Sequence, residues 1–141
     1  MILIDANLLL YAYDESSSGH VPARSWLDAV FSGKEQVWLS WMTILAFLRI
    51  STNPRALQNP LTMREASEIV ETWLERPQVD ILNPGESHWQ ILRELVLDSQ
   101  VRSQYVADAH LAALAIEHGA TLYTHDRDFA RFHGLKFVHP I

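Results

Sequence analysis

The chain opens with a short, uninterrupted apolar run. Residues Ile2–Ile4 are all apolar, and Asp5 follows them directly. A strand that is apolar on both faces is typical of a parallel sheet covered by helices on each side. Asp5 would then lie at the carboxyl end of this strand, the edge at which open α/β sheets bind their ligands. The pattern predicts a buried parallel strand with a carboxylate at the functional edge.

Apolar runs and helical periodicities alternate along the rest of the chain. Further strands are predicted at 37–40, 79–82, 121–124 and 136–138, and helices at 8–13, about 21–32, 41–50, 63–75, 87–98, 106–118 and 127–132. Strands that alternate with helices predict parallel pairing with helices on both faces. We therefore expect a single α/β domain over residues 1–141, a three-layer α/β/α sandwich with a mainly parallel sheet of four to five strands.

Local signals support several of these boundaries. Thr62 followed by Glu65 forms a capping box, and Gly119 is placed to end the helix before it. The helix at 41–50 is apolar at nearly every position, so we expect it to be largely enclosed. Because most of the five tryptophans fall on apolar stripes, we expect them in the core.

Composition narrows the functional classes. With 141 residues, 48% of them hydrophobic, and no cysteine, the chain has neither a disulfide framework nor a thiolate metal site. No apolar run reaches the roughly 20 residues that span a bilayer, and the start resembles no signal peptide, so we expect a cytoplasmic protein. The net charge of −6 argues against broad, sequence-independent binding of nucleic acid, but not against a metal-dependent nuclease.

A second informative carboxylate lies in the predicted helix at 106–118. Asp108 is followed by Leu111, Ala112 and Ala115 on the same helical face. This face must pack on the sheet, so the pattern directs Asp108 inward. The alternative is an acid near the helix N-terminus that only stabilises the helix dipole.

A third carboxylate follows the predicted strand at 121–124. Asp126 repeats the arrangement of Asp5 at a carboxyl strand end, and Asp128 is close behind it. The alternative for either residue is N-capping of the short helix that begins at Arg127. Inward carboxylates at one edge repel each other unless a cation lies between them, and an all-oxygen site suits Mg²⁺ or Mn²⁺. The residues therefore indicate metal-dependent phosphate chemistry.

Three segments together resemble the PIN-domain ribonucleases, and most closely the VapC toxins of bacterial toxin–antitoxin pairs. These are Ile2–Asn7, Asp108–Ala115 and Leu122–Phe129, and the likeness extends through Ala46–Arg49. The resemblance implies a Mg²⁺-dependent endoribonuclease, a VapB-like antitoxin partner and a homodimer. Asp5, Asp108 and Asp126 match the family's acidic positions, while Asn7 and Thr124 match its polar neighbours. We expect the three aspartates to bind the metal directly or through water, with Asn7, Thr124 and Asp128 in support.

One departure from the family pattern concerns the helix after the second strand. Ala46 stands where the family usually carries a glutamate, and no acid occurs between Val37 and Arg64. This leaves two readings open, an active nuclease with fewer metal ligands or a catalytically weak module that binds an antitoxin.

A third reading is a phosphatase of the haloacid dehalogenase type. Such an enzyme would need a catalytic lysine at the sheet edge, and the only lysines are Lys34 and Lys136. Arginines at 49, 55, 102 and 127 are candidate guides for RNA.

Overall fold

The five strands of the protein form one parallel sheet in the order β3-β2-β1-β4-β5. The computed structural model describes residues 1–141. The strands are β1 (Ile2–Ile4), β2 (Val37–Leu39), β3 (Val79–Ile81), β4 (Thr121–Tyr123) and β5 (Phe137–Val138). The strand Ile2–Ile4 lies in the centre and pairs with β2 on one side and β4 on the other. The predicted parallel α/β fold is confirmed, with five strands.

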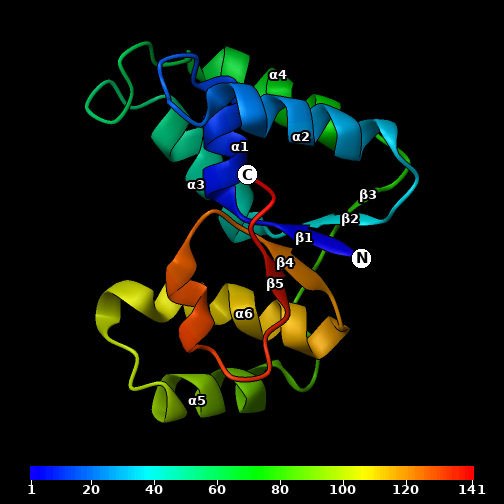
Figure 1. The fold of residues 1–141 in the computed structure, drawn as a ribbon, viewed down its shortest axis with the longest axis vertical. Helices are drawn as coiled ribbons and strands as arrows, with labels where there is room; N and C mark the ends of the chain where they lie inside the picture. The colour runs from blue at the N-terminus through cyan, green and yellow to red at the C-terminus, as the bar shows by residue number, and fades with distance from the viewer.

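Helices cover both faces of this sheet (Figure 1). On one face lie α1 (Ala6–Tyr13), α2 (His20–Ser32), α3 (Trp41–Ser51) and α4 (Met63–Leu74). On the other lie α5 (His88–Asp98), α6 (Val106–His118) and two short 3₁₀ helices, η1 (Ser103–Tyr105) and η2 (Arg127–Arg131). The sandwich therefore has the three predicted layers.

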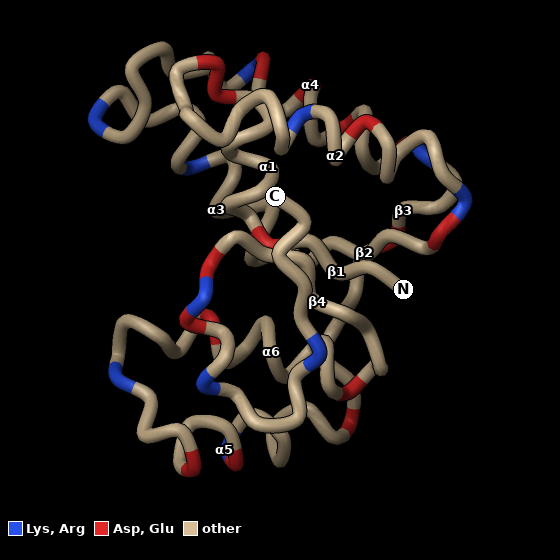
Figure 2. The backbone as a smooth tube through the Cα atoms, viewed as in Figure 1, with Lys and Arg blue, Asp and Glu red and all other residues tan.

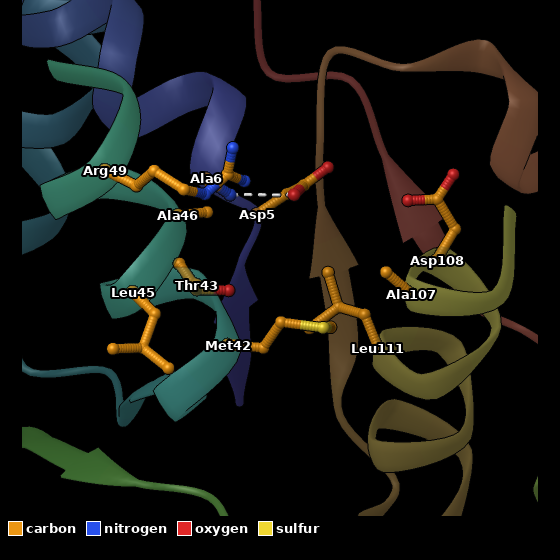
Figure 3. Close-up of a pocket in the computed structure, with 10 residues that line it drawn as sticks. All are labelled: Asp5, Ala6, Met42, Thr43, Leu45, Ala46, Arg49, Ala107, Asp108 and Leu111. Atoms are coloured by element: carbon orange, nitrogen blue, oxygen red, sulfur yellow. Dashed lines mark hydrogen bonds between the residues drawn. The ribbon is translucent and has the colours of Figure 1, made fainter. Parts of the chain in front are cut away.

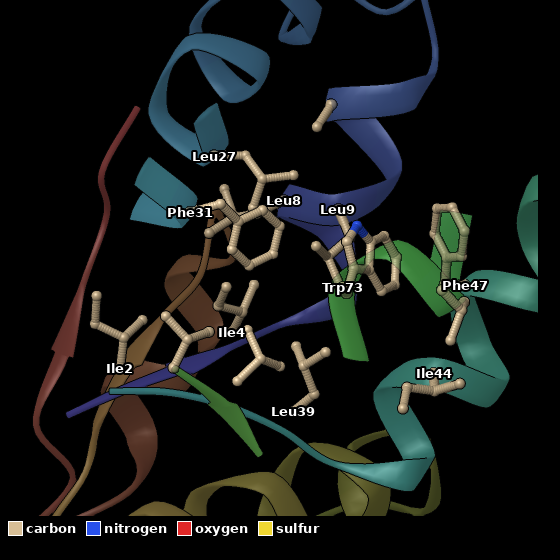
Figure 4. Packing of buried hydrophobic residues seen from close by; sticks show 14 of the residues in the cluster. Ile2, Ile4, Leu8, Leu9, Leu27, Phe31, Leu39, Ile44, Phe47 and Trp73 are labelled. Carbon is tan, nitrogen blue, oxygen red and sulfur yellow. The ribbon is translucent and has the colours of Figure 1, made fainter. Parts of the chain in front are cut away.

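Each face has its own hydrophobic core, and the central strand supplies both. Ile2 and Ile4 point into the core under α1–α4, whereas Leu3 points into the core under α5 and α6. Alternate side chains of a strand point to opposite faces, so the unbroken apolar run satisfies both layers. On the first face Phe47 packs against Trp73 with ring centroids 4.7 Å apart (Figure 4).

The predicted helix boundaries agree with the structure at most positions. The Thr62 and Glu65 capping box is present with both of its hydrogen bonds, and Gly119 ends α6 with a positive φ of 68°. The first helix begins at Ala6 rather than Leu8 because the carboxylate of Asp5 caps it. The 3₁₀ turn Ser103–Tyr105 was not predicted.

Two expectations about burial are met only in part. Most of α3 is enclosed, but Trp41 and Leu45 are 52% and 61% exposed, because one side of this helix faces away from the sheet. Among the other tryptophans, Trp89 on α5 is 67% exposed, whereas Trp73 is buried and Trp26 and Trp38 are partly buried against the two cores. An apolar residue beside an amphipathic stripe need not belong to it, and Val21 of α2, 74% exposed, is a further example. No helix is long and apolar enough to cross a membrane.

Candidate active site

Asp5 lies at the carboxyl edge of the sheet, where its side chain is held by three donors. Oδ1 accepts a 2.7 Å hydrogen bond from the backbone N–H of Ala6, which makes Asp5 the N-cap of α1. Oδ2 accepts from the hydroxyl of Thr124 at 2.7 Å and from the amide of Asn7 at 3.2 Å. Two of the three supporting residues named from the sequence, Asn7 and Thr124, therefore contact Asp5, and the carboxylate has a fixed orientation.

Asp108 reaches the same edge from the first turn of α6. Together with Asp5 it lines a cavity of about 340 Å³ that lies between α3 and α6. Figure 3 shows both carboxylates pointing to the same side of this cavity. The helical face predicted to pack inward does so, since Leu111 and Ala112 below Asp108 are buried. The structure thus brings together two of the three predicted acids around one cavity.

Asp126 and Asp128 lie in the turn that follows β4, at the same carboxyl edge of the sheet. Asp126 is the N-cap of η2, and its Oδ1 accepts a 2.8 Å hydrogen bond from the backbone N–H of Asp128. Asp128 is therefore not the cap, and its carboxylate is 3.8 Å from the guanidinium of Arg131. The backbone N–H of Asp126 donates to the hydroxyl of Thr124, which links this turn to Asp5.

The carboxylates interact electrostatically. Burial raises the pKa of Asp5, and the negative charge of Asp126 raises it further. Burial also raises the pKa of Asp108 to about 6, with added repulsion from Asp5, Asp126 and Asp128. Each ionised carboxylate makes the others harder to ionise, and a divalent cation between them would relieve this cost.

These residues fit a Mg²⁺ site of a particular kind. No three carboxylate, imidazole or thiolate side chains lie close enough together to hold one metal ion. Mg²⁺ typically uses one or two protein carboxylates and completes its shell with waters and substrate phosphate oxygens. Asp5 and Asp108, on one cavity, match that pattern. Asp126 does not line this cavity, so it fits contact through water better than direct ligation.

The opposite wall of the cavity comes from α3 and carries no acid. Ala46 lies on this wall, with Met42, Thr43, Leu45 and Arg49 around it. Arg49 extends toward the start of α1 (Figure 3) and lies within ion-pair distance of no carboxylate. Of the four arginines suggested from the sequence, it alone lines the cavity. The cavity therefore has a negative wall and a wall with one unpaired positive charge.

Charge over the remainder of the molecule forms no extended basic surface. Lys and Arg are spread singly over several elements, as Figure 2 shows. The two lysines lie at the amino ends of strands, Lys34 before β2 and Lys136 before β5. Neither is at the carboxyl edge, where a dehalogenase-type phosphatase would need it.

Comparisons with known proteins agree with this geometry. A family model described as PIN domain matches residues 2–135. Ribonuclease VapC37 of Mycobacterium tuberculosis is 39% identical over 140 residues, 99% of this chain and 97% of that protein. VapC ribonuclease Mb2897 of Mycobacterium bovis is 36% identical over 141 residues, 100% of this chain and 96% of that protein.

Solved structures share the fold at lower identity. VapBC2 from Rickettsia felis, bound to a promoter DNA fragment, superposes with a TM-score of 0.71 at 17% identity and covers 98% of each chain. VapC20 of Mycobacterium tuberculosis, described as a toxin that cleaves the sarcin–ricin loop, gives a TM-score of 0.66 at 17% identity, covering 96% of this chain and 99% of that one.

Proposed function

The chain belongs to the PIN-domain family, in its VapC group, and on that premise we propose that it is a Mg²⁺-dependent endoribonuclease. The observation that carries this proposal is the pair of carboxylates on one cavity, Asp5 and Asp108, whose pKa values are raised by burial and by neighbouring acids. Relatives named ribonucleases, with 36–39% identity over nearly the whole chain, support it.

The proposed reaction is hydrolysis of an RNA phosphodiester bond. Water adds to phosphorus, the bond to one ribose oxygen breaks, and that oxygen leaves with a proton. A bound Mg²⁺ would lower the pKa of the attacking water and stabilise charge on the phosphate. Asp5 and Asp108 would hold this ion, while Thr124 and Asn7 keep Asp5 in place through the hydrogen bonds described above. Asp126 orients water at the same edge, with Asp128 beside it.

Arg49 has a separate role in this proposal. Its guanidinium lies on the wall opposite Asp108 and has no carboxylate partner. An unpaired arginine that faces the site of a phosphodiester can bind a phosphate oxygen of the substrate. The carboxylates would then bind the cation while Arg49 binds the anion.

The partners follow from the same premise. We propose a VapB-like antitoxin as inhibitor, supported by structural neighbours that are VapBC complexes. We also propose a homodimer acting in the cytoplasm, with Mn²⁺ able to replace Mg²⁺. Co-expression with a VapB-like antitoxin should yield one stable complex that does not cleave RNA.

The direct test uses purified, partner-free protein and structured RNA. Cleavage should require Mg²⁺ and stop with EDTA, and Asp5→Asn should abolish it. The matched control is Asp98→Asn, which removes one exposed carboxylate at the end of α5 and should leave cleavage unchanged. Full cleavage by Asp5→Asn would overturn the proposed mechanism.

The second candidate is a module that binds the antitoxin but cuts poorly. The acid-free wall around Ala46 favours it, because this wall can supply no further metal ligand. Antitoxin binding without cleavage under any divalent cation would select this candidate.

A further inference from the structure

A second hollow lies beside α1 and the turn that follows β4. It has a volume of about 300 Å³, at the lower end of the range for small-ligand sites. Tyr11 of α1 and His125, just after β4, form two of its walls, and Ser17 and Ser18 contribute hydroxyl groups. The rest of the lining comes from Gly19, Pro22 and Ile141, and no lysine, arginine, aspartate or glutamate side chain takes part. The hollow therefore suits a neutral, planar group with polar edges better than a phosphate.

The two aromatic side chains of this hollow pack edge to face. The ring centroids of Tyr11 and His125 are 5.4 Å apart, and the ring planes make an angle of 84°. In this arrangement the edge of one ring contacts one face of the other, so the ring that presents its edge keeps both of its faces free of its partner. A third ring that stacks on it would also meet the partner's face with its edge. Unstacked RNA bases are bound in this way, by stacking on tyrosine or histidine with hydrogen bonds at the base edge.

Asn7 connects the hollow to the carboxylate cavity. Its amide nitrogen donates to Oδ2 of Asp5 at 3.2 Å, and its amide oxygen accepts from the backbone N–H of His125 at 3.2 Å. Tyr11 follows Asn7 by four residues on α1, so the two side chains lie on the same helical face about 6 Å apart along the axis. The hollow thus lies one helical turn from the carboxylates, and its position relative to Asp5 is fixed by hydrogen bonds.

We propose that this hollow binds one unstacked base of the RNA, next to the phosphate that is cut. The inference rests on the proposed function, because it assigns the base-reading part of the same substrate site. It separates two tasks: the carboxylate cavity acts on the phosphodiester, which every nucleotide shares, and the Tyr11 and His125 hollow distinguishes one base. The position of the cut along an RNA would then depend on which base the hollow accepts.

The test uses a series of short single-stranded RNAs, each with an abasic site at a different position. Affinity is measured by fluorescence anisotropy in EDTA, where metal-dependent cleavage does not occur, and cleavage rates are then measured with Mg²⁺. For the wild-type protein, removal of the base at one position should weaken binding at least about fivefold, the lower end of what stacking on one aromatic side chain contributes.

The variants then show whether the hollow causes this effect. Tyr11→Leu and His125→Ala should bind intact RNA more weakly and should no longer distinguish the abasic position. Tyr11→Phe and His125→Phe keep the rings and should retain the effect. Trp89→Leu, which removes an exposed aromatic ring on α5 away from the hollow, is the matched control and should behave as the wild type.

The outcomes separate the inference from the proposed function. A position-dependent abasic effect that Tyr11→Leu and His125→Ala remove supports the inference, even if no RNA is cut and the nuclease proposal fails. Cleavage with the same abasic profile in all variants overturns the inference and leaves the nuclease intact. Loss of antitoxin binding in these two variants with an unchanged RNA profile also overturns it, because the hollow would then be a protein contact.

Discussion

The hydroxyl of Thr124 donates a 2.7 Å hydrogen bond to Oδ2 of Asp5, although 119 residues separate the two in sequence. The hydroxyl oxygen of Thr124 also accepts hydrogen bonds from the backbone N–H of Asp126 at 3.0 Å and from the amide of Asn7 at 3.3 Å. One buried hydroxyl therefore makes the three hydrogen bonds that its chemistry permits. It joins the carboxyl ends of β1 and β4 at the site.

Replacing this hydroxyl by a methyl group tests its role. Thr124→Val keeps the shape but leaves the backbone N–H of Asp126 without its acceptor and removes one of the three donors to Asp5. We expect a loss of about 1–3 kcal/mol in the free energy of unfolding and about 10- to 100-fold in cleavage rate. Thr124→Ser retains the hydroxyl and should stay within a few-fold of the wild type. Wild-type cleavage by Thr124→Val would show that Asp5 needs no such support.

The carboxyl of Asp108 makes stability depend on pH. Its pKa rises from an ordinary 3.8 to about 6 in the folded protein, and that of Asp5 is also raised. Between the ordinary pKa of 3.8 and the folded pKa of about 6, Asp108 keeps a proton in the folded protein that it has released in the unfolded chain. The free energy of unfolding therefore falls as pH rises through the folded pKa. We expect Asp108 to lower the free energy of unfolding by about 1–2 kcal/mol over this pH range, after allowance for solvent screening.

Chemical denaturation in EDTA at several pH values measures this decrease. Asp108→Asn should flatten the profile, and Mg²⁺ should stabilise the wild-type protein more at neutral pH, where the carboxylate is ionised. If the free energy of unfolding of Asp108→Asn depended on pH as it does in the wild type, the decrease could not be assigned to Asp108.

Arg49 is expected to act on substrate binding more than on the chemical step. Arg49→Gln removes the unpaired charge on the α3 wall, so KM should rise about 5- to 10-fold. The slope of the logarithm of the binding constant against the logarithm of salt concentration should become shallower by about 1, the value for one phosphate contact. Arg64→Gln is the matched control, because Arg64 is exposed on α4 and away from the cavity. Equal salt dependence in both variants would show that Arg49 contacts no phosphate.

The acid-free wall of the cavity can be changed by one substitution. Ala46→Glu places a carboxylate on the wall that faces Asp5 and Asp108, so it should tighten metal binding and can add a second cation. Calorimetric titration with Mn²⁺ reports both affinity and stoichiometry. Gln90→Glu adds the same charge at an exposed position of α5 and should change neither. Identical titrations for the two variants would mean that residue 46 cannot reach the ion.

Two tryptophans of the chain should differ strongly in their effect on stability. Trp73 is 1% exposed, packs against Phe47, and donates a 3.1 Å hydrogen bond to the hydroxyl of Tyr13. Trp73→Ala should cost about 3–5 kcal/mol in the free energy of unfolding. Trp89→Ala, on an exposed surface, should change it by less than about 0.5 kcal/mol. Urea denaturation of both variants measures the difference, and equal losses would contradict the core described above.

The sheet was predictable because its central strand is apolar on both faces. Ile2–Ile4 can be satisfied only by helices on each side, and this requirement sets the layers without knowledge of any contact. The positions of Asp5 and Asp126 followed from the rule that carboxyl ends of parallel strands meet at one edge. Which of the two neighbouring acids caps η2 was not predictable, because Asp126 and Asp128 are equally suitable residue types.

Other parts of the site depend on how the helices are placed on the sheet. Arg49 looks the same in sequence as Arg55, and only the position of α3 puts it on the cavity wall. Tyr11 carried no functional signal, since one aromatic residue on a short apolar helix indicates packing. Its relation to His125 arises from tertiary contacts between α1 and the turn after β4, which periodicity does not report.

The central position of β1 also sets the order in which the site is assembled during synthesis. The ribosome makes Asp5 first, but its partners Thr124 and Asp126 come near the end, and β1 waits for β4 to fill its second side. A nascent chain that still lacks β4 contains neither the hydroxyl that orients Asp5 nor the turn beside it. The RNA-cutting site proposed here can therefore form only after almost the whole chain has been translated.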